Sequence, residues 1–225
     1  MTTPNADPFS DFLYPFIENK EQVPLASVLD EVRGSTQQKA REIAEMRQAF
    51  FDEQGETLIA AAEDMARSFA DGGQLLAFGN GGSATDAQDI AADFLNPGNG
   101  YPPLPALSLT NDIGVVTAVG NDVGFENVFV RQVIAYGRPG DIAVGFSTSG
   151  QSPNVVSALE HAQKMNLLTI GIAGYDGGKM ARAGLDHCFI VRSTYIPRIQ
   201  EVQATVYHTL WELTHRRLEA RHEVR

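Results

Sequence analysis

Short apolar runs alternate with longer amphipathic stretches over most of the chain after residue 74. Five of these runs are almost continuously apolar, as expected of strands that are buried on both faces of a sheet. They lie at residues 74–78, 106–109, 142–146, 168–173 and 187–191. The stretches between them predict helices at about 84–95, 112–120, 123–136, 153–166 and 178–183. Strands that alternate with helices predict a parallel sheet with helices on both faces.

The chain on either side of these runs has the pattern of helices alone. A helix is predicted at residues 25–32, and Ser35-Thr36-Gln37-Gln38 has the form of a capping box that opens a second one. Gly55 is expected to separate this helix from a third, which ends at Asp71-Gly72-Gly73. A last helix is predicted at about 198–219. The fold class is therefore α/β, a doubly wound five-stranded parallel sheet with N-terminal helices and a long C-terminal helix.

The length of 225 residues allows one substantial core. Residues 1–30 combine prolines with aromatic side chains. Aromatic rings favour burial, so we expect either an N-terminal arm that lies across the body or a neighbouring subunit, or a frayed tail. Residues 31–225 are then expected to form one domain that includes the N-terminal helices.

Composition argues against several kinds of partner. The formal net charge is −11 and no cluster of Lys or Arg forms a basic face, so nucleic-acid binding is not expected. No window approaches 18 consecutive apolar residues, which argues against a membrane span. The N-terminus does not have the pattern of a signal peptide. The single cysteine, Cys188, cannot form an internal disulfide, so we expect a reducing compartment, the cytoplasm.

A glycine-rich turn follows the first predicted strand. Gly79-Asn80-Gly81-Gly82-Ser83 leads directly into a predicted helix. Glycines let the backbone approach a ligand, and the free N–H groups of the first helical turn bind anions. Ser83 is expected to cap the helix and offer a hydroxyl. The turn has no lysine and no third spaced glycine, so a small phosphorylated ligand is expected and no nucleotide cofactor.

A second polar loop follows the third predicted strand. Ser147-Thr148-Ser149-Gly150-Gln151-Ser152-Pro153 places four hydroxyls ahead of a helix. Hydroxyls and free N–H groups can hold an anion, although an ordinary turn with Ser152 as N-cap contains the same residues. Ligands of parallel sheets bind beyond the carboxyl ends of the strands, where the strand order reverses. The two loops together predict a phosphate site at that edge.

Five sequence blocks occur in order from about residue 74 to residue 213. They read FGNGGSATDAQDIAADF, SLTNDIGVVTAVGNDVGFENVF, VGFSTSGQSPNVVSALEHA, LTIGIAGYDGG and RIQEVQATVYHTLWEL. Together they resemble the bacterial phosphoheptose isomerases, which are sedoheptulose 7-phosphate isomerases of the SIS (sugar isomerase) domain class. The resemblance implies a flavodoxin-like SIS fold. It also implies an aldose–ketose isomerisation of a phosphorylated sugar in a homotetramer with active sites at subunit contacts.

The resemblance further implies a role for each matching residue. The phosphate would be held by Ser147, Thr148, Ser149 and Ser152. The sugar would be lined by Asn80, Gly81, Gly82, Ser83, Thr110, Asp112 and Gln200. The acid–base pair would be Asp93 and His208. Some members hold zinc, and the positions that match their ligands are Asp89, Asp93, Gln200 and His208.

The chain departs from the family's pattern at three places. The family's metal-binding His is Asp89 here, its catalytic Glu is Asp93, and its Ser-Thr-Asp-Thr before the last helix is Ser193-Thr194-Tyr195-Ile196. Isomerisation through an enediol needs a base and an acid, and histidine can serve either role. Asp93 is one methylene shorter than Glu, and a misplacement of about 1 Å can cost on the order of a hundredfold in rate.

The predicted metal site is a separate question. Asp89 and Asp93 are four residues apart on one helix face, a spacing that lets two side chains share an ion. With Gln200 and His208 they would offer three oxygens and one nitrogen to zinc, manganese or magnesium. The alternative is a solvated acidic stripe. The remaining histidines that lack such spacing are expected at the surface: His161, His215 and His222.

Three functional hypotheses follow. The first is an isomerase that converts sedoheptulose 7-phosphate to a manno-heptose 7-phosphate, with His208 and Asp93 as acid and base. The second is a non-catalytic protein that binds a sugar phosphate or a partner protein. The third is an isomerase for a different sugar phosphate, with Tyr195 and Ile196 reshaping the pocket.

Overall fold

The computed structural model of the protein describes residues 25–98 and 100–223. The chain forms two compact units, residues 1–42 and residues 43–225, and the second contains the whole sheet. Most of the arm predicted at residues 1–30 lies outside the described residues, so it stays a prediction. No described helix has the length and apolar content needed to cross a membrane.

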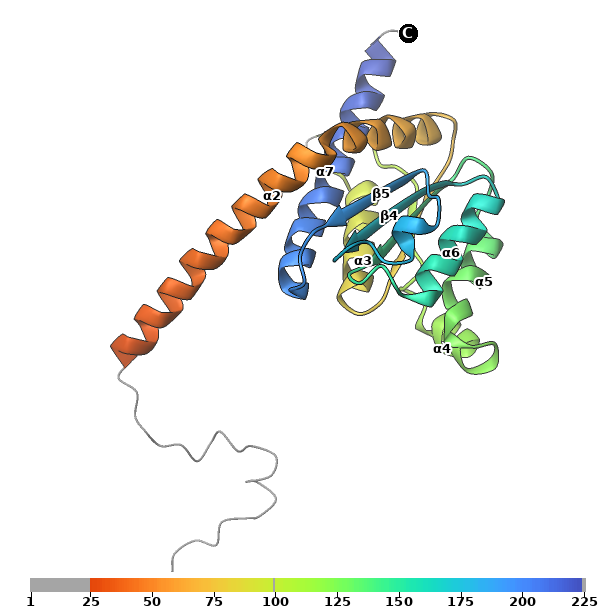
Figure 1. Ribbon diagram of the computed structural model, residues 1–225. Helices are drawn as coiled ribbons and strands as arrows, with labels where there is room; N and C mark the ends of the chain where they lie inside the picture. The colour runs from red at the N-terminus through yellow and green to blue at the C-terminus, as the bar shows by residue number, and fades with distance from the viewer. Residues whose placement is uncertain (1–24, 99, 224–225) are drawn as a thin grey trace, which may run out of the picture. The chain divides into compact units, whose positions relative to one another are not determined.

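A single five-stranded parallel sheet forms the centre of the second unit (Figure 1). Its order is β2-β1-β3-β4-β5, which confirms the predicted doubly wound fold. The strands are β1 (Leu75–Gly79), β2 (Ala106–Ser108), β3 (Ile142–Ser147), β4 (Leu168–Gly174) and β5 (His187–Val191). Each lies within a residue or so of its predicted position, because the three central strands, β1, β3 and β4, are buried on both faces and the strands are largely apolar.

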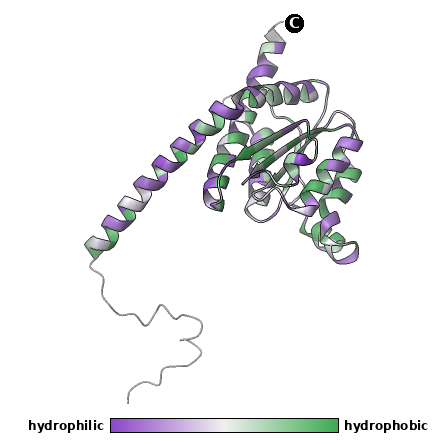
Figure 2. Ribbon diagram, in the orientation of Figure 1, coloured by the Kyte–Doolittle hydropathy of each residue, from purple (hydrophilic) through white to green (hydrophobic). Residues whose placement is uncertain are grey.

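Helices cover both faces of the sheet. They are α2 (Leu25–Ala70), α3 (Gly82–Leu95), α4 (Ile113–Asp122), α5 (Val128–Tyr136), α6 (Pro153–Lys164) and α7 (Ile196–Glu223), with short 3-10 turns η1 (Phe125–Asn127) and η2 (Met180–Arg182). One core packs residues 43–70 of α2 together with α3 and α7 against one face, and the other packs α5 and α6 against the opposite face (Figure 1). Successive strand residues alternate between the two cores: Leu75 and Ala77 belong to the first, Leu76 and Phe78 to the second. Figure 2 shows the hydrophobic strands between helices with mixed faces.

The helices before the sheet differ from the prediction. Residues 25–70 form one continuous helix, α2, where three helices were expected. Ser35 therefore lies inside a helix and caps nothing, and Gly55 does not end one. A glycine inside a helix costs only about 1 kcal/mol relative to alanine, and the buried apolar side chains of residues 43–69 supply far more than that.

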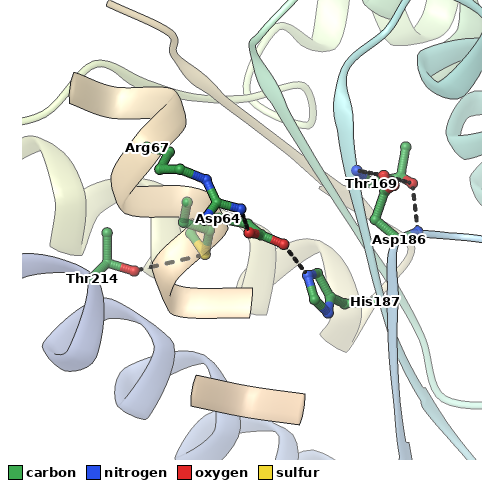
Figure 3. A network of polar contacts seen from close by, with 7 residues as sticks. Asp64, Arg67, Thr169, Asp186, His187 and Thr214 are labelled. Atoms are coloured by element: carbon green, nitrogen blue, oxygen red, sulfur yellow. Dashed lines mark hydrogen bonds and ion pairs between the residues drawn. The ribbon is translucent and has the colours of Figure 1, made fainter. Parts of the chain in front are cut away.

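A polar network joins α2 to the far edge of the sheet (Figure 3). His187, at the start of β5, lies with its Nε2 2.7 Å from Asp64 Oδ2 on α2, and Arg67 pairs with the same carboxylate. The His187 side chain is only 10% exposed, whereas that of Arg67 is 57% exposed. On the neighbouring strand Thr169 donates its N–H and its hydroxyl to Asp186.

Replacing His187 by alanine should destabilise the protein by about 1–3 kcal/mol, because the substitution leaves a partly buried Asp64 oxygen without its donor. Arg67→Ala removes an exposed partner of the same carboxylate and should cost less than about 0.5 kcal/mol. Urea unfolding of the two variants measures the difference. Equal losses would show that burial of His187 does not strengthen the contact.

Candidate active site

The two predicted anion-binding turns lie side by side. β1 and β3 are hydrogen-bonded neighbours, with Phe78 opposite Gly145 and Gly79 opposite Phe146. The loops that follow them therefore leave the same edge of the sheet. The side chains of Asn80 and Asn154 join the loops through two reciprocal amide hydrogen bonds, each 2.9 Å long. This is the switch point at which doubly wound sheets bind ligands.

Two glycines of the glycine-rich turn are closely packed, whereas the space beside Gly81 is open. A Cβ at Gly79 would overlap the backbone of Ser83, and one at Gly82 would overlap the side-chain amide of Gln200. Gly81 has a positive φ of 57° and is the N-cap of α3. The expectation that Ser83 caps the helix is wrong, because α3 begins at Gly82 and its N-cap is Gly81. Ser83 is instead buried in its first turn.

Internal hydrogen bonds and close packing hold the hydroxyl-rich loop at residues 147–152. Ser147 Oγ lies 2.9 Å from Ser152 Oγ, and Ser149 Oγ accepts the N–H of Gln151. Thr148 and Ser149 are partly exposed. The loop after β4 packs against this one so closely that a Cβ at Gly150 would overlap the Gly177 carbonyl. The four hydroxyls therefore lie next to the glycine turn, on a loop that packs closely against the loop after β4.

The side chains after β2 have local partners. Thr110 Oγ1 lies 2.7 Å from Ser108 Oγ, and it accepts a hydrogen bond from Gln88 on α3. Asp112 is the N-cap of α4 and accepts the N–H of Val115. Thr110 Oγ1 also donates to the Ala84 carbonyl in the first turn of α3 at 3.5 Å, whereas the Asp112 carboxylate is used as a cap.

The predicted acid–base pair forms between α3 and α7. His208 Nε2 lies 3.3 Å from Asp93 Oδ2, and this oxygen makes no hydrogen bond with any described residue. The His208 side chain is 56% exposed and that of Asp93 is 36% exposed. Both line a cavity of about 530 Å³, together with Arg47, Asn96, Pro97, Gly98, Thr205, Thr209, Trp211 and Glu212. A ligand in this cavity can reach both groups.

Burial and the Asp89 carboxylate raise the pKa values of two other acidic side chains on α3, Asp86 and Asp93. Partial burial raises the pKa of Asp93, and the Asp89 carboxylate raises it further, while the His208 imidazole opposes them. Burial and Asp89 raise the pKa of Asp86 to about 7. Tyr207 on α7 donates its hydroxyl to Asp89 at 3.4 Å. The α3–α7 contact therefore includes one carboxyl group, that of Asp86, that can exchange a proton near neutral pH.

The four predicted metal ligands do not come together. No group of three His, Cys, Asp or Glu side chains within residues 25–98 and 100–223 is arranged to hold a metal ion. The Gln200 amide packs on Gly82, at the other end of α3 from Asp93. A zinc site needs about four converging ligands. As placed, these residues do not fit the metal that the resemblance implied.

Comparison with known proteins assigns the chain to a family. The sequence profile of the SIS domain matches residues 40–174. A phosphoheptose isomerase of Desulfovibrio desulfuricans is 49% identical over 177 residues, which cover 78% of this chain and 83% of that protein. One from Nitratidesulfovibrio vulgaris is 45% identical over 186 residues, or 82% and 89% of the two chains. The chain belongs to the phosphoheptose isomerase family of SIS domain proteins.

Solved structures of phosphoheptose isomerases have the same fold. The protein from Neisseria gonorrhoeae has a TM-score of 0.75 and 38% identity, and the match covers 80% of this chain and 97% of that one. The protein from Francisella tularensis has a TM-score of 0.75 and 33% identity, with 84% and 98% covered. The resemblance and the fold predicted from the sequence are both confirmed.

Three side chains at this family member's site were not singled out as site residues from the sequence. Asn154 joins the two turns, Arg47 brings a positive charge to the cavity, and Trp211 donates its indole N–H to the Asp93 carbonyl at 3.0 Å. Asparagine at the second position of a helix after a serine-rich loop was a usable signal for Asn154. Arg47 has no such signal, because it lies far along the chain from every motif.

One histidine expected at the surface is buried. His215 is 1% exposed and stacks on Tyr101 with ring centroids 4.7 Å apart. Burial lowers its pKa, and neither ring nitrogen makes a hydrogen bond within the described residues. The neutral ring therefore serves as part of an aromatic cluster with Phe94 and Trp211.

Replacing Asp86 by asparagine should stabilise the protein at about pH 8 by on the order of 2 kcal/mol, and much less near pH 5. The raised pKa means that folded Asp86 binds a proton that the unfolded chain releases above about pH 4, so wild-type stability falls as pH rises toward 7. Urea unfolding at the two pH values tests this. The exposed Asp71→Asn should show no such difference, and a gain at Asp86→Asn that does not depend on pH would contradict the account.

Proposed function

We propose that the protein is an aldose–ketose isomerase of the cytoplasm that converts sedoheptulose 7-phosphate to a manno-heptose 7-phosphate through an enediol. The observation that carries this proposal is the contact between His208 and Asp93 at a cavity wall, in a chain that belongs to the phosphoheptose isomerase family. An enediol reaction needs such an acid–base pair.

The two turns after β1 and β3 would hold the phosphate. They offer hydroxyls and the N–H groups of two helix starts, and these groups suit an anion without a lysine. Residues 82 to 93 span about 16 Å of α3 between the glycine turn and the acid–base pair. A seven-carbon sugar phosphate covers more of this distance than a smaller one would, because its carbonyl lies several carbons from its phosphate.

In the proposed reaction the Asp93 carboxylate takes a proton from C1 of the ketose. His208, protonated, gives a proton to the carbonyl oxygen on C2, and the enediol forms. Loss of the O1 proton and return of a proton to C2 then give the aldose. The raised pKa of Asp93 makes its carboxylate a stronger base than an exposed aspartate. Arg47 lines the same cavity and would stabilise negative charge that develops on the substrate oxygens.

We further propose that the protein assembles as a homotetramer with active sites at subunit contacts. The support in this chain is α4, which is rich in apolar residues but has none buried. Ile113 is 70% exposed at its start, and Phe125 in η1, just after it, is 56% exposed. Exposed apolar side chains gathered in this way are typical of protein interfaces.

A second candidate function is binding of a sugar phosphate without conversion. It is favoured by the aspartates at positions 89 and 93, which differ from the family's pattern, and by the lack of a metal-binding group among the described residues. It is also favoured by Tyr195 and Ile196, which are 57% and 47% exposed before and at the start of α7. An isomerase for another sugar phosphate is the third candidate. A panel of sugar phosphates, measured for both binding and turnover, separates the three.

Replacing His208 by alanine or Asp93 by asparagine should lower kcat for sedoheptulose 7-phosphate by about 10²–10⁴-fold, because each change removes one proton-transfer group. His161→Ala removes an imidazole that hydrogen-bonds the Ser157 carbonyl within α6, outside the proposed site, and should leave the rate unchanged. Product aldose measured by NMR gives the rates. Full activity in either site variant, or binding of the substrate by the wild type without turnover, would exclude this mechanism.

Replacing Phe125 by serine should shift the protein from tetramer toward smaller species in sedimentation velocity runs at micromolar concentration, because the change removes apolar area from the proposed interface. Tyr136→Ser, at a 44% exposed site on α5, serves as the matched control and should leave the tetramer intact. A wild-type monomer would contradict the proposed assembly, and a tetramer unaffected by Phe125→Ser would exclude this surface.

A further inference from the structure

The amides of Asn80 and Asn154 link the glycine-rich turn directly to the start of α6, which follows the serine-rich loop. Asn80 Nδ2 donates to Asn154 Oδ1, and Asn154 Nδ2 donates to Asn80 Oδ1, both at 2.9 Å. Asn154 Oδ1 also accepts the N–H of Val155 at 3.0 Å. Asn154 is only 2% exposed. A buried amide depends on such partners, because no water replaces a hydrogen bond that is lost.

The pair joins the parts of the chain that carry the proposed phosphate donors. Asn80 belongs to the turn whose next residues open α3, and Asn154 lies in the first turn of α6, directly after Ser152. The distance between the two helix starts decides whether both can touch one phosphate. Donors that are fixed in advance bind an anion better than donors that must be ordered on binding.

We propose that Asn154 is a positioning residue for the phosphate. Through its hydrogen bonds with Asn80 it holds the two anion-binding turns at a fixed spacing. The proposal rests on the proposed function for the identity of the ligand. It assigns to the Asn80 side chain a role in joining the loops, since both atoms of its amide group are engaged by Asn154. Asn80 keeps one amide N–H and one lone pair beyond this pair, so the joining role does not prevent contact with the sugar.

The test compares Asn80→Ala, Asn154→Ala and the double variant. Each single change should weaken binding of inorganic phosphate, measured by calorimetry, by about tenfold, and raise KM for sedoheptulose 7-phosphate by a similar factor with a smaller change in kcat. The double variant should be no worse than either single one, because both changes break the same pair. Gln38→Ala, at an exposed amide side chain on α2, is the control and should bind phosphate like the wild type.

Asn154→Asp covers the case in which the alanine variant does not fold. Aspartate keeps the shape of the side chain and still accepts from Asn80, but it loses one donor and adds a negative charge beside the phosphate site. Phosphate binding should therefore fall at least tenfold.

Two results would overturn the proposal. One is unchanged phosphate affinity in folded variants, and the other is a double variant whose fold-loss in affinity equals the product of the two single losses. Loss of phosphate binding in a protein that turns over no sugar phosphate would support the positioning role and reject the proposed reaction. Calorimetry with inorganic phosphate thus separates the two failures.

Discussion

The hydrogen-bonded pairing of β1 with β3 is the constraint on which the site depends. The two strands are separated by more than sixty residues of sequence, yet they run parallel in adjacent positions, so their following loops leave the sheet together. Each loop opens a helix, and each helix start offers free N–H groups to the same space. If β1 and β3 were not neighbours, neither the glycine turn nor the serine-rich loop alone would make a convincing phosphate site.

The glycines that let the two loops pack closely, and the groups that would hold the phosphate, are uncharged. Glycines at positions 79, 82 and 150 stand where a side chain would collide with backbone or with Gln200, so the loops can pack closely on their surroundings. The phosphate would be held by hydroxyls, amides and helix starts. Charged side chains are concentrated elsewhere, where α3 meets α7, and burial there raises the pKa values of two carboxyl groups, Asp86 and Asp93. The proposed anion-binding turn and the proposed proton-transfer pair thus lie at opposite ends of one helix, α3.

Much of the fold could be predicted from the sequence, because strands buried on both faces leave an unmistakable run of apolar residues. The two loops could be located for the same reason, since they follow those runs. The extent of α2 could not be predicted, because local glycine and serine signals compete with burial of its apolar stripe, and burial is decided by tertiary contacts. The positions of Asn154, Arg47 and His215 also depend on contacts between distant segments. The predicted metal ligands do not converge for a related reason. Sequence spacing shows that Asp89 and Asp93 share one helix, but it does not show whether Gln200 lies beside them.

The most direct measurement of the central claim is solvent exchange during turnover. Incubating the protein with sedoheptulose 7-phosphate in D₂O and recording the NMR spectrum of the product follows the proton that an enediol reaction must pass through the acid–base pair. The account predicts an aldose that carries deuterium on C2, next to its carbonyl carbon. Phosphate binding with neither product nor deuterium in the recovered ketose would contradict it.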